Sequence, residues 1–113
     1  MQIEKSDAGG ITTLKLSGEI DLHASPVLRA ELQKCVKAKA TALLLDFSSV
    51  EYIDSSGLAT LIEYIRESSS FKGRLALFGL QKKVRTIFDL VRLNELFTIS
   101  ESAEEAASAL KAK

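Results

Sequence analysis

Two short apolar runs constrain the fold of this chain more than any other feature of its sequence. ALLLDF (42–47) and RLALFG (74–79) lack the alternation of a strand with one face in water. Each run therefore indicates a strand that is covered on both faces. Apolar residues around these runs recur at helical spacing. Buried strands that alternate with amphipathic helices predict a mostly parallel sheet with right-handed crossovers.

The remaining segments predict a hairpin, further helices and a last strand. MQIEK and ITTLKLSG flank a turn cluster at 6–10 and indicate an antiparallel β-hairpin, whose second strand is expected to end at Gly18. Ser25 before Pro26 predicts a helix with Ser25 as its N-cap. The other expected elements are a helix over 55–68, a helix over 82–91, a strand over 96–99 and a final helix opened by the capping-box pair Ser102 and Glu105. We expect an α/β fold with a mixed sheet of about five strands and about four helices, in one domain over 1–113.

Charge and composition argue against several classes of protein. Fifteen basic residues balance fifteen acidic ones, so nothing predicts a nucleic-acid surface. Lys82, Lys83 and Arg85 share one face of a predicted helix, which we expect to be solvated, with contact to an acidic partner as the alternative. The single cysteine, Cys35, lies on an apolar stripe and is expected in the core. No run approaches the ~20 apolar residues of a membrane span and no secretory signal is visible, so we expect a cytoplasmic protein without membrane insertion.

The stretch Asp54-Ser55-Ser56-Gly57 lies where a predicted strand meets a predicted helix. Helix capping is one interpretation, because Asp and Ser oxygens satisfy free N–H groups at a helix start. Capping needs only one such residue, and a glycine in the first turn costs about 1 kcal/mol relative to alanine. Gly57 therefore suggests that something approaches the backbone closely. A helix N-terminus also favours negative charge, so a serine there can be phosphorylated without loss of the helix.

Three stretches of the chain together resemble a known family. YIDSSGLATL (52–61) resembles the phosphorylation motif of the STAS domain, as found in bacterial anti-sigma factor antagonists. LSGEIDLHAS (16–25) resembles that family's second strand and following loop, and LFGLQKKVRTIFDLVRLNELFTI (77–99) resembles its late strand, helix and final strand. Ala59 and Arg92 stand where many members have glycine, and Arg92 puts the local loop shape in doubt.

The resemblance implies a partner switch with Ser55, directly after the aspartate, as the phosphoacceptor. The unphosphorylated domain would bind an anti-sigma factor that is also a serine kinase, and so free a sigma factor. Phosphorylation by that kinase would end the complex, and a serine phosphatase would reset the switch. Ser56 is expected to be structural, with its hydroxyl available to a first-turn N–H. The implied partner-binding residues are Asp21, His23, Asp54, Ser55, Ser56, Gly57 and Leu58.

Catalytic and metal-binding interpretations are weaker. A hydrolase triad would combine Ser55 with the single histidine, His23, and with Asp21 or Asp54 as third member. No nucleophile-elbow glycine precedes the serine, so we expect no enzyme. Glu19, Asp21 and Asp54 match no dedicated metal loop, and we expect neither metal nor cofactor.

The main alternative remains within the same family. STAS-like domains also serve as non-switching subunits of lipid-transport or stress-sensing complexes. In those settings the acceptor serine is commonly replaced or another domain is fused. The chain keeps Ser55, which favours the switch.

Overall fold

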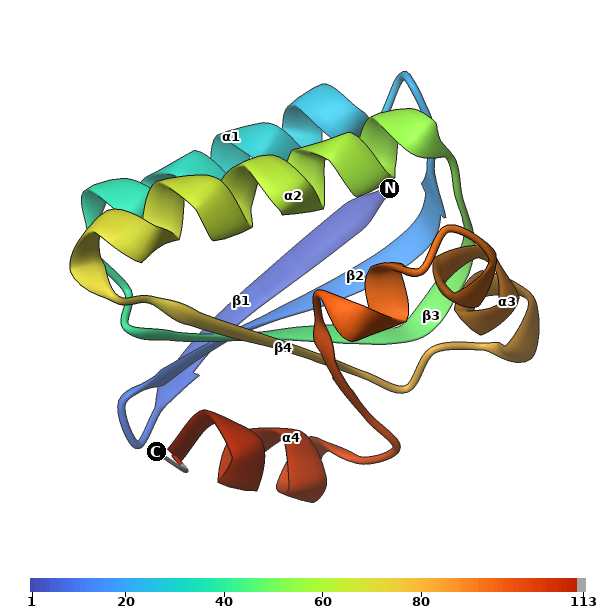
Figure 1. The fold of residues 1–113 in the computed structure, drawn as a ribbon. Coiled ribbons are helices and arrows are strands. Elements are labelled where there is room, and N and C mark those ends of the chain that lie inside the picture. Colours follow the sequence, from blue (N-terminus) through green and yellow to red (C-terminus); the bar gives the residue numbers. More distant parts are fainter. Residues whose placement is uncertain (112–113) are drawn as a thin grey trace.

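The computed structural model of the chain describes residues 1–111 and contains a five-stranded mixed sheet with helices on both faces (Figure 1). The strands follow one another in chain order; β1 pairs antiparallel with β2, and all later neighbours pair in parallel. The elements are β1 (Gln2–Ala8), β2 (Ile11–Ile20), α1 (Ser25–Lys37), β3 (Ala42–Ile53), α2 (Ser55–Ser68), η1 (Ser69–Phe71), β4 (Arg74–Phe78), α3 (Lys82–Leu90), η2 (Leu93–Glu95), β5 (Thr98–Ser100) and α4 (Ala103–Lys111). The predicted α/β fold is confirmed.

The apolar run 42–47 lies in the central strand β3, which has a core on each of its faces. Leu43, Leu45 and Phe47 belong to the core shared with α1, α2 and α3. Leu44, between them, belongs to the smaller core under α4. Figure 1 shows α1 and α2 together over one face of the sheet and α4 beneath the other. Both faces of β3 are therefore covered, as parallel strands require.

The prediction that the second strand ends at Gly18 is wrong. β2 continues to Ile20, and its pairing with β3 shifts register between Gly18 and Glu19. Gly18 has a φ of +95°, which favours glycine, so it marks an irregularity inside the strand and not its end. The strand β3 likewise runs past residue 47 to Ile53, which pairs with Ile20. The two strands thus end side by side.

The predicted N-cap of α1 is also wrong. Ser25 is the first helical residue, and no side chain caps the helix at Ala24. The carboxylate of Asp21 accepts hydrogen bonds from the N–H groups of His23 (3.0 Å) and Ala24 (2.9 Å) instead. Asp21 therefore caps an extra turn that leads into α1, because its carbonyl also accepts from the N–H of Ser25 (2.9 Å).

The C-terminal elements follow the prediction with a small shift. The last strand covers Thr98–Ser100 and so begins two residues later than expected. The hydroxyl of Ser102 accepts from the N–H of Glu105 at 3.2 Å, which confirms one half of the expected capping box. Cys35 is buried, as expected. Within residues 1–111, no helix has both the length and the apolar character to cross a bilayer.

Candidate functional site

The candidate site lies where β2 and β3 end and α1 and α2 begin. Ile20 and Ile53 are register partners, and the N–H of Asp54 donates to the carbonyl of Ile20 at 3.1 Å. Asp21 and Asp54, each the next residue, therefore follow neighbouring strand ends. The carboxyl ends of parallel strands are a usual place for ligands and partners in open α/β sheets.

Asp54 is the N-cap of α2. Its backbone is extended, and its carboxylate accepts from the N–H groups of Ser56 (2.9 Å) and Gly57 (3.3 Å). The hydroxyl of Ser56 is the main cause that lowers the pKa of Asp54 from its ordinary value. The N–H groups of Gly57, Ser56 and Leu22 lower that pKa further. Asp54 is therefore charged at neutral pH and joins the start of α2 to the loop before α1.

Ser56 is half-buried and its hydroxyl is engaged on two sides. It lies within hydrogen-bond distance of the carboxylate of Asp54 and 2.8 Å from the hydroxyl of Ser25. The hydroxyl of Ser25, itself buried, also lies 2.8 Å from the carbonyl of Asp21. The two hydroxyl protons are shared among these three contacts, and either serine can donate to the other. The expected bond of Ser56 to a first-turn N–H is thus replaced by a bridge between the starts of α1 and α2.

Ser55 has a different environment from its neighbour. It is the first residue of α2, its side chain is exposed, and its hydroxyl makes no hydrogen bond to any of the residues 1–111. An incoming group can therefore reach its oxygen without breaking an internal contact. Of the two adjacent hydroxyls, that of Ser56 is hydrogen-bonded within the fold and that of Ser55 is accessible to solvent.

Packing inside the chain explains why position 57 is a glycine. A Cβ at this position would lie 2.7 Å from Ile20 Cγ2 and 2.7 Å from Ile53 Cγ1. The close approach that the sequence suggested is therefore the approach of α2 to the two strand ends. Leu58 is also buried, at 8% exposure, and packs in the main core. Gly57 and Leu58 support the site from below, and their contact with a partner stays a prediction.

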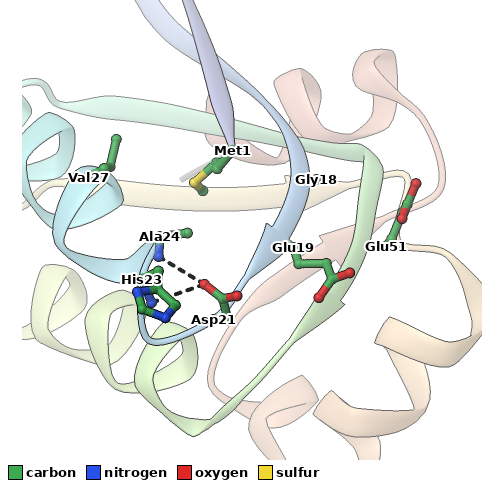
Figure 2. A pocket seen from close by; sticks show the side chains of 8 residues that line it. All are labelled: Met1, Gly18, Glu19, Asp21, His23, Ala24, Val27 and Glu51. Atoms are coloured by element: carbon green, nitrogen blue, oxygen red, sulfur yellow. Dashed lines mark hydrogen bonds between the residues drawn. The ribbon is translucent and has the colours of Figure 1, made fainter.

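The loop between β2 and α1 borders the site on its other side. Its residues Leu22 and His23 are exposed, and the carbonyl of Ile20 just before the loop accepts from the N–H of Asp54. Figure 2 shows Asp21 and its bonds beside a surface hollow of about 500 Å³. The residues that line the hollow are Met1, Gly18, Glu19, Asp21, His23, Ala24, Val27 and Glu51.

The weaker interpretations gain no support from the geometry. His23 makes no side-chain hydrogen bond to Ser55 in the described chain, and no three acidic, histidine or cysteine side chains among residues 1–111 are placed to hold a metal. Arg85 forms an ion pair with Asp89 at 3.3 Å. Lys82 and Lys83 are exposed in the isolated chain, and contact of this face with an acidic partner stays a prediction.

Sequence reasoning missed two features of the site. The bridge between Ser25 and Ser56 joins residues 31 positions apart, and no local pattern indicates it. Leu22 was not singled out, although a large apolar residue between Asp21 and His23 in a polar loop is itself an unusual signal.

Comparison with known proteins agrees with this geometry. The family model of the STAS domain matches residues 2–106. The anti-sigma-B factor antagonist of Bacillus subtilis is 30% identical over 91 residues, which cover 80% of this chain and 83% of that protein. A crystal structure of an anti-sigma factor antagonist from Mycobacterium paratuberculosis superposes with a TM-score of 0.90 at 24% identity, covering 98% of this chain and 94% of that one. The phosphorylated form of the Bacillus cell fate determinant SpoIIAA superposes with a TM-score of 0.73 at 23% identity, over 96% and 99% of the two chains. The chain belongs to the STAS domain family.

Proposed function

We propose that this chain is an anti-sigma factor antagonist that works by partner switching. Unphosphorylated, it binds an anti-sigma factor with serine kinase activity and thereby frees a sigma factor. Phosphorylation of Ser55 by that kinase ends the complex, and a serine phosphatase restores it. The proposed role places the chain in the cytoplasm, as one STAS domain over residues 1–113, without catalytic activity of its own. Relatives that carry the name anti-sigma factor antagonist support the general role.

The observation that carries the proposal is the difference between two adjacent hydroxyls. Ser55 is exposed and makes no hydrogen bond to residues 1–111, whereas Ser56 bonds to Asp54 and contacts Ser25. Phosphorylation of Ser56 would break the bridge between α1 and α2. A phosphate on Ser55 breaks no such contact, and the positive end of the α2 dipole favours its charge.

The charge change accounts for the switch without a change of fold. Phosphorylation adds about −1.5 to −2 charges at Ser55. In the close-packed contact directly around the hydroxyl of Ser55, this group loses water and gains no cation. A penalty of ~3 kcal/mol weakens binding by about 100-fold. The starts of α1 and α2 stay joined through Ser56, so the phosphorylated chain remains folded.

Three variants test the proposal with the purified serine-kinase anti-sigma factors of the source organism. Ser55→Ala should bind the kinase and stay bound in the presence of ATP and magnesium, because it cannot accept phosphate. Ser55→Asp should bind weakly. Ser70→Asp places the same charge on an exposed serine in η1, beyond the C-terminal end of α2, and should bind like the wild type. Mass spectrometry should locate the phosphate on Ser55.

Two results would contradict the switch. The first is phosphate on Ser56 alone, and the second is undiminished binding by both Ser55→Asp and the phosphorylated chain. A pull-down that recovers an ATPase with membrane subunits, and no kinase, would instead support a non-switching role in a lipid-transport complex.

Asp21 and His23 belong to the proposed partner face together with residues 54–58. Because Asp21 caps the turn before α1, Asp21→Ala removes both the cap of that turn and any contact between Asp21 and the kinase. Asp21→Asn keeps an oxygen for the cap and removes the charge, so it isolates the contact. Weaker kinase binding by Asp21→Asn would place the carboxylate in the interface, and unchanged binding would remove it.

A further inference from the structure

Leu22 is a large apolar side chain that the fold holds in water. It is 71% exposed, in the loop between β2 and α1. The N–H of Asp54 donates to the carbonyl of Ile20, two residues before Leu22, and the carboxylate of Asp21 accepts from the two N–H groups after it. The backbone is therefore held on both sides of the residue. An exposed leucine adds little to folding, yet its burial by a partner is favourable.

Other exposed apolar side chains lie around the same corner of the molecule. Val27, in the first turn of α1, is 50% exposed and lines the hollow in Figure 2. Tyr52, two residues before Asp54, is 44% exposed. The charged groups of the lining residues are the carboxylates of Glu19, Asp21 and Glu51 and the N-terminal ammonium group of Met1, so negative charge prevails. The surface around the loop between β2 and α1 is thus apolar in part and acidic in part.

We infer that Leu22 is an apolar anchor of the surface that docks the kinase on this chain. This inference rests on the proposed function. The occupant is the protein that brings its phosphate donor to Ser55, and it presents an apolar pocket to Leu22. We expect the partner to carry lysine or arginine side chains at the edge of its apolar pocket, opposite the acidic hollow, because complementary charges steer association.

The size of protein interfaces supports this assignment. A specific interface buries about 800 Å² on each partner, which corresponds to a disc of about 16 Å radius. Leu22 lies two residues after Ile20, whose carbonyl accepts from the N–H of Asp54, and Asp54 directly precedes Ser55. A protein that encloses the hydroxyl of Ser55 in its active site therefore also covers Leu22. Because the loop is already held in place, little ordering entropy is lost when it docks.

The test compares two exposed leucines. Leu22→Ala should weaken binding to the purified serine-kinase anti-sigma factor by about tenfold, mainly through faster dissociation. Leu90→Ala is the matched control, because Leu90 is 78% exposed at the end of α3, outside the loop and the hollow. It should bind like the wild type. Both variants should keep the wild-type melting temperature, since neither side chain is packed.

Kinetics distinguish docking from catalysis. With Leu22→Ala, the KM for phosphorylation of Ser55 should rise while the rate at saturating substrate stays close to that of the wild type. In a second arm, Glu51→Gln should slow association and reduce its salt dependence, as expected for a charge at the rim.

The outcomes separate this inference from the proposed function. If the wild type binds the kinase and Ser55→Asp does not, while Leu22→Ala binds like the wild type, the anchor is refuted and the switch stands. Equal losses for Leu22→Ala and Leu90→Ala would also refute it, because the effect would not be specific to the loop. If Glu51→Gln associates at the wild-type rate, the inference that lysine or arginine side chains of the partner face this hollow is refuted. If no kinase of the organism binds or phosphorylates the wild type, both proposals fail.

Discussion

Replacement of Gly57 by alanine tests how tightly α2 is seated on the strand ends. The added Cβ would lie 2.7 Å from side-chain carbons of both Ile20 and Ile53, and 3.1 Å from the carbonyl oxygen of Ile20. Both isoleucines are fully buried, so neither has free space into which it can turn. The start of α2 would therefore have to move away from the sheet, and Ser55 would move with it.

Two opposing effects set the magnitude. Alanine is about 1 kcal/mol better than glycine inside a helix. Overpacking of a buried contact costs about 1–3 kcal/mol. Because the clash involves two fully buried branched side chains and a backbone oxygen, we place it at the upper end of that range. The free energy of unfolding of Gly57→Ala should therefore fall by about 1–2 kcal/mol, which lowers the melting temperature by about 4–8 °C.

Thermal and urea unfolding followed by circular dichroism measure this difference. Ala59→Gly, at an exposed position two residues further along α2, measures the helix-propensity effect alone. The steric cost is then the loss in Gly57→Ala plus the propensity gain that the control supplies. If Gly57→Ala is as stable as the wild type or more stable, Ile20 and Ile53 can move to admit the added methyl group at little cost. Packing would then not explain the glycine. The close approach of a partner would then become the better explanation.

Two further predictions concern titratable groups. Tyr64 is buried, its hydroxyl has no hydrogen-bond partner among residues 1–111, and burial raises its pKa to about 12. Tyr64→Phe should therefore keep or raise the melting temperature, and a loss above about 1 kcal/mol would reveal a partner for the hydroxyl. The pKa of Asp54 is lowered in the folded chain, so its stabilising effect is complete above the ordinary value of 3.8 and is lost as the pH falls through the lower folded value. The stability difference between wild type and Asp54→Asn should shrink in that acidic range in urea unfolding, and a constant difference would contradict this sign.

Local signals were enough to predict most of the fold. The runs 42–47 and 74–79 became adjacent parallel strands because their residues pack on both faces. The start of α2 at Ser55 was predicted correctly because Asp54 caps it through its own side chain, a contact within three residues. Signals that act within one turn of helix, or along one strand, can be recognised in the sequence alone.

The errors lie where distant segments decide local structure. Gly18 would end an isolated strand, but the pairing of β2 with β3 continues beyond it to Ile20. Ser25 has the sequence context of an N-cap, yet Asp21 performs the capping and the hydroxyl of Ser25 contacts Ser56. Arg92 has a φ of +60°, so the backbone keeps the left-handed shape although the residue is not glycine. None of these outcomes follows from neighbouring residues.

Under the proposed switch, the arrangement around Asp54 gives the two adjacent serines separate roles. Without Ser56, Asp54 would be the main connection between the start of α2 and the segment before α1, directly beside the proposed phosphoacceptor Ser55. Asp54 and a phosphate on Ser55 carry like charges and repel each other. Ser56 supplies a second connection, because its hydroxyl donates to Asp54 and also contacts Ser25 on α1. The donors around Asp54 stabilise its charge before any phosphate is added. The repulsion therefore acts on an already anchored carboxylate, and the cost of the added charge appears mainly at the surface that a partner must cover.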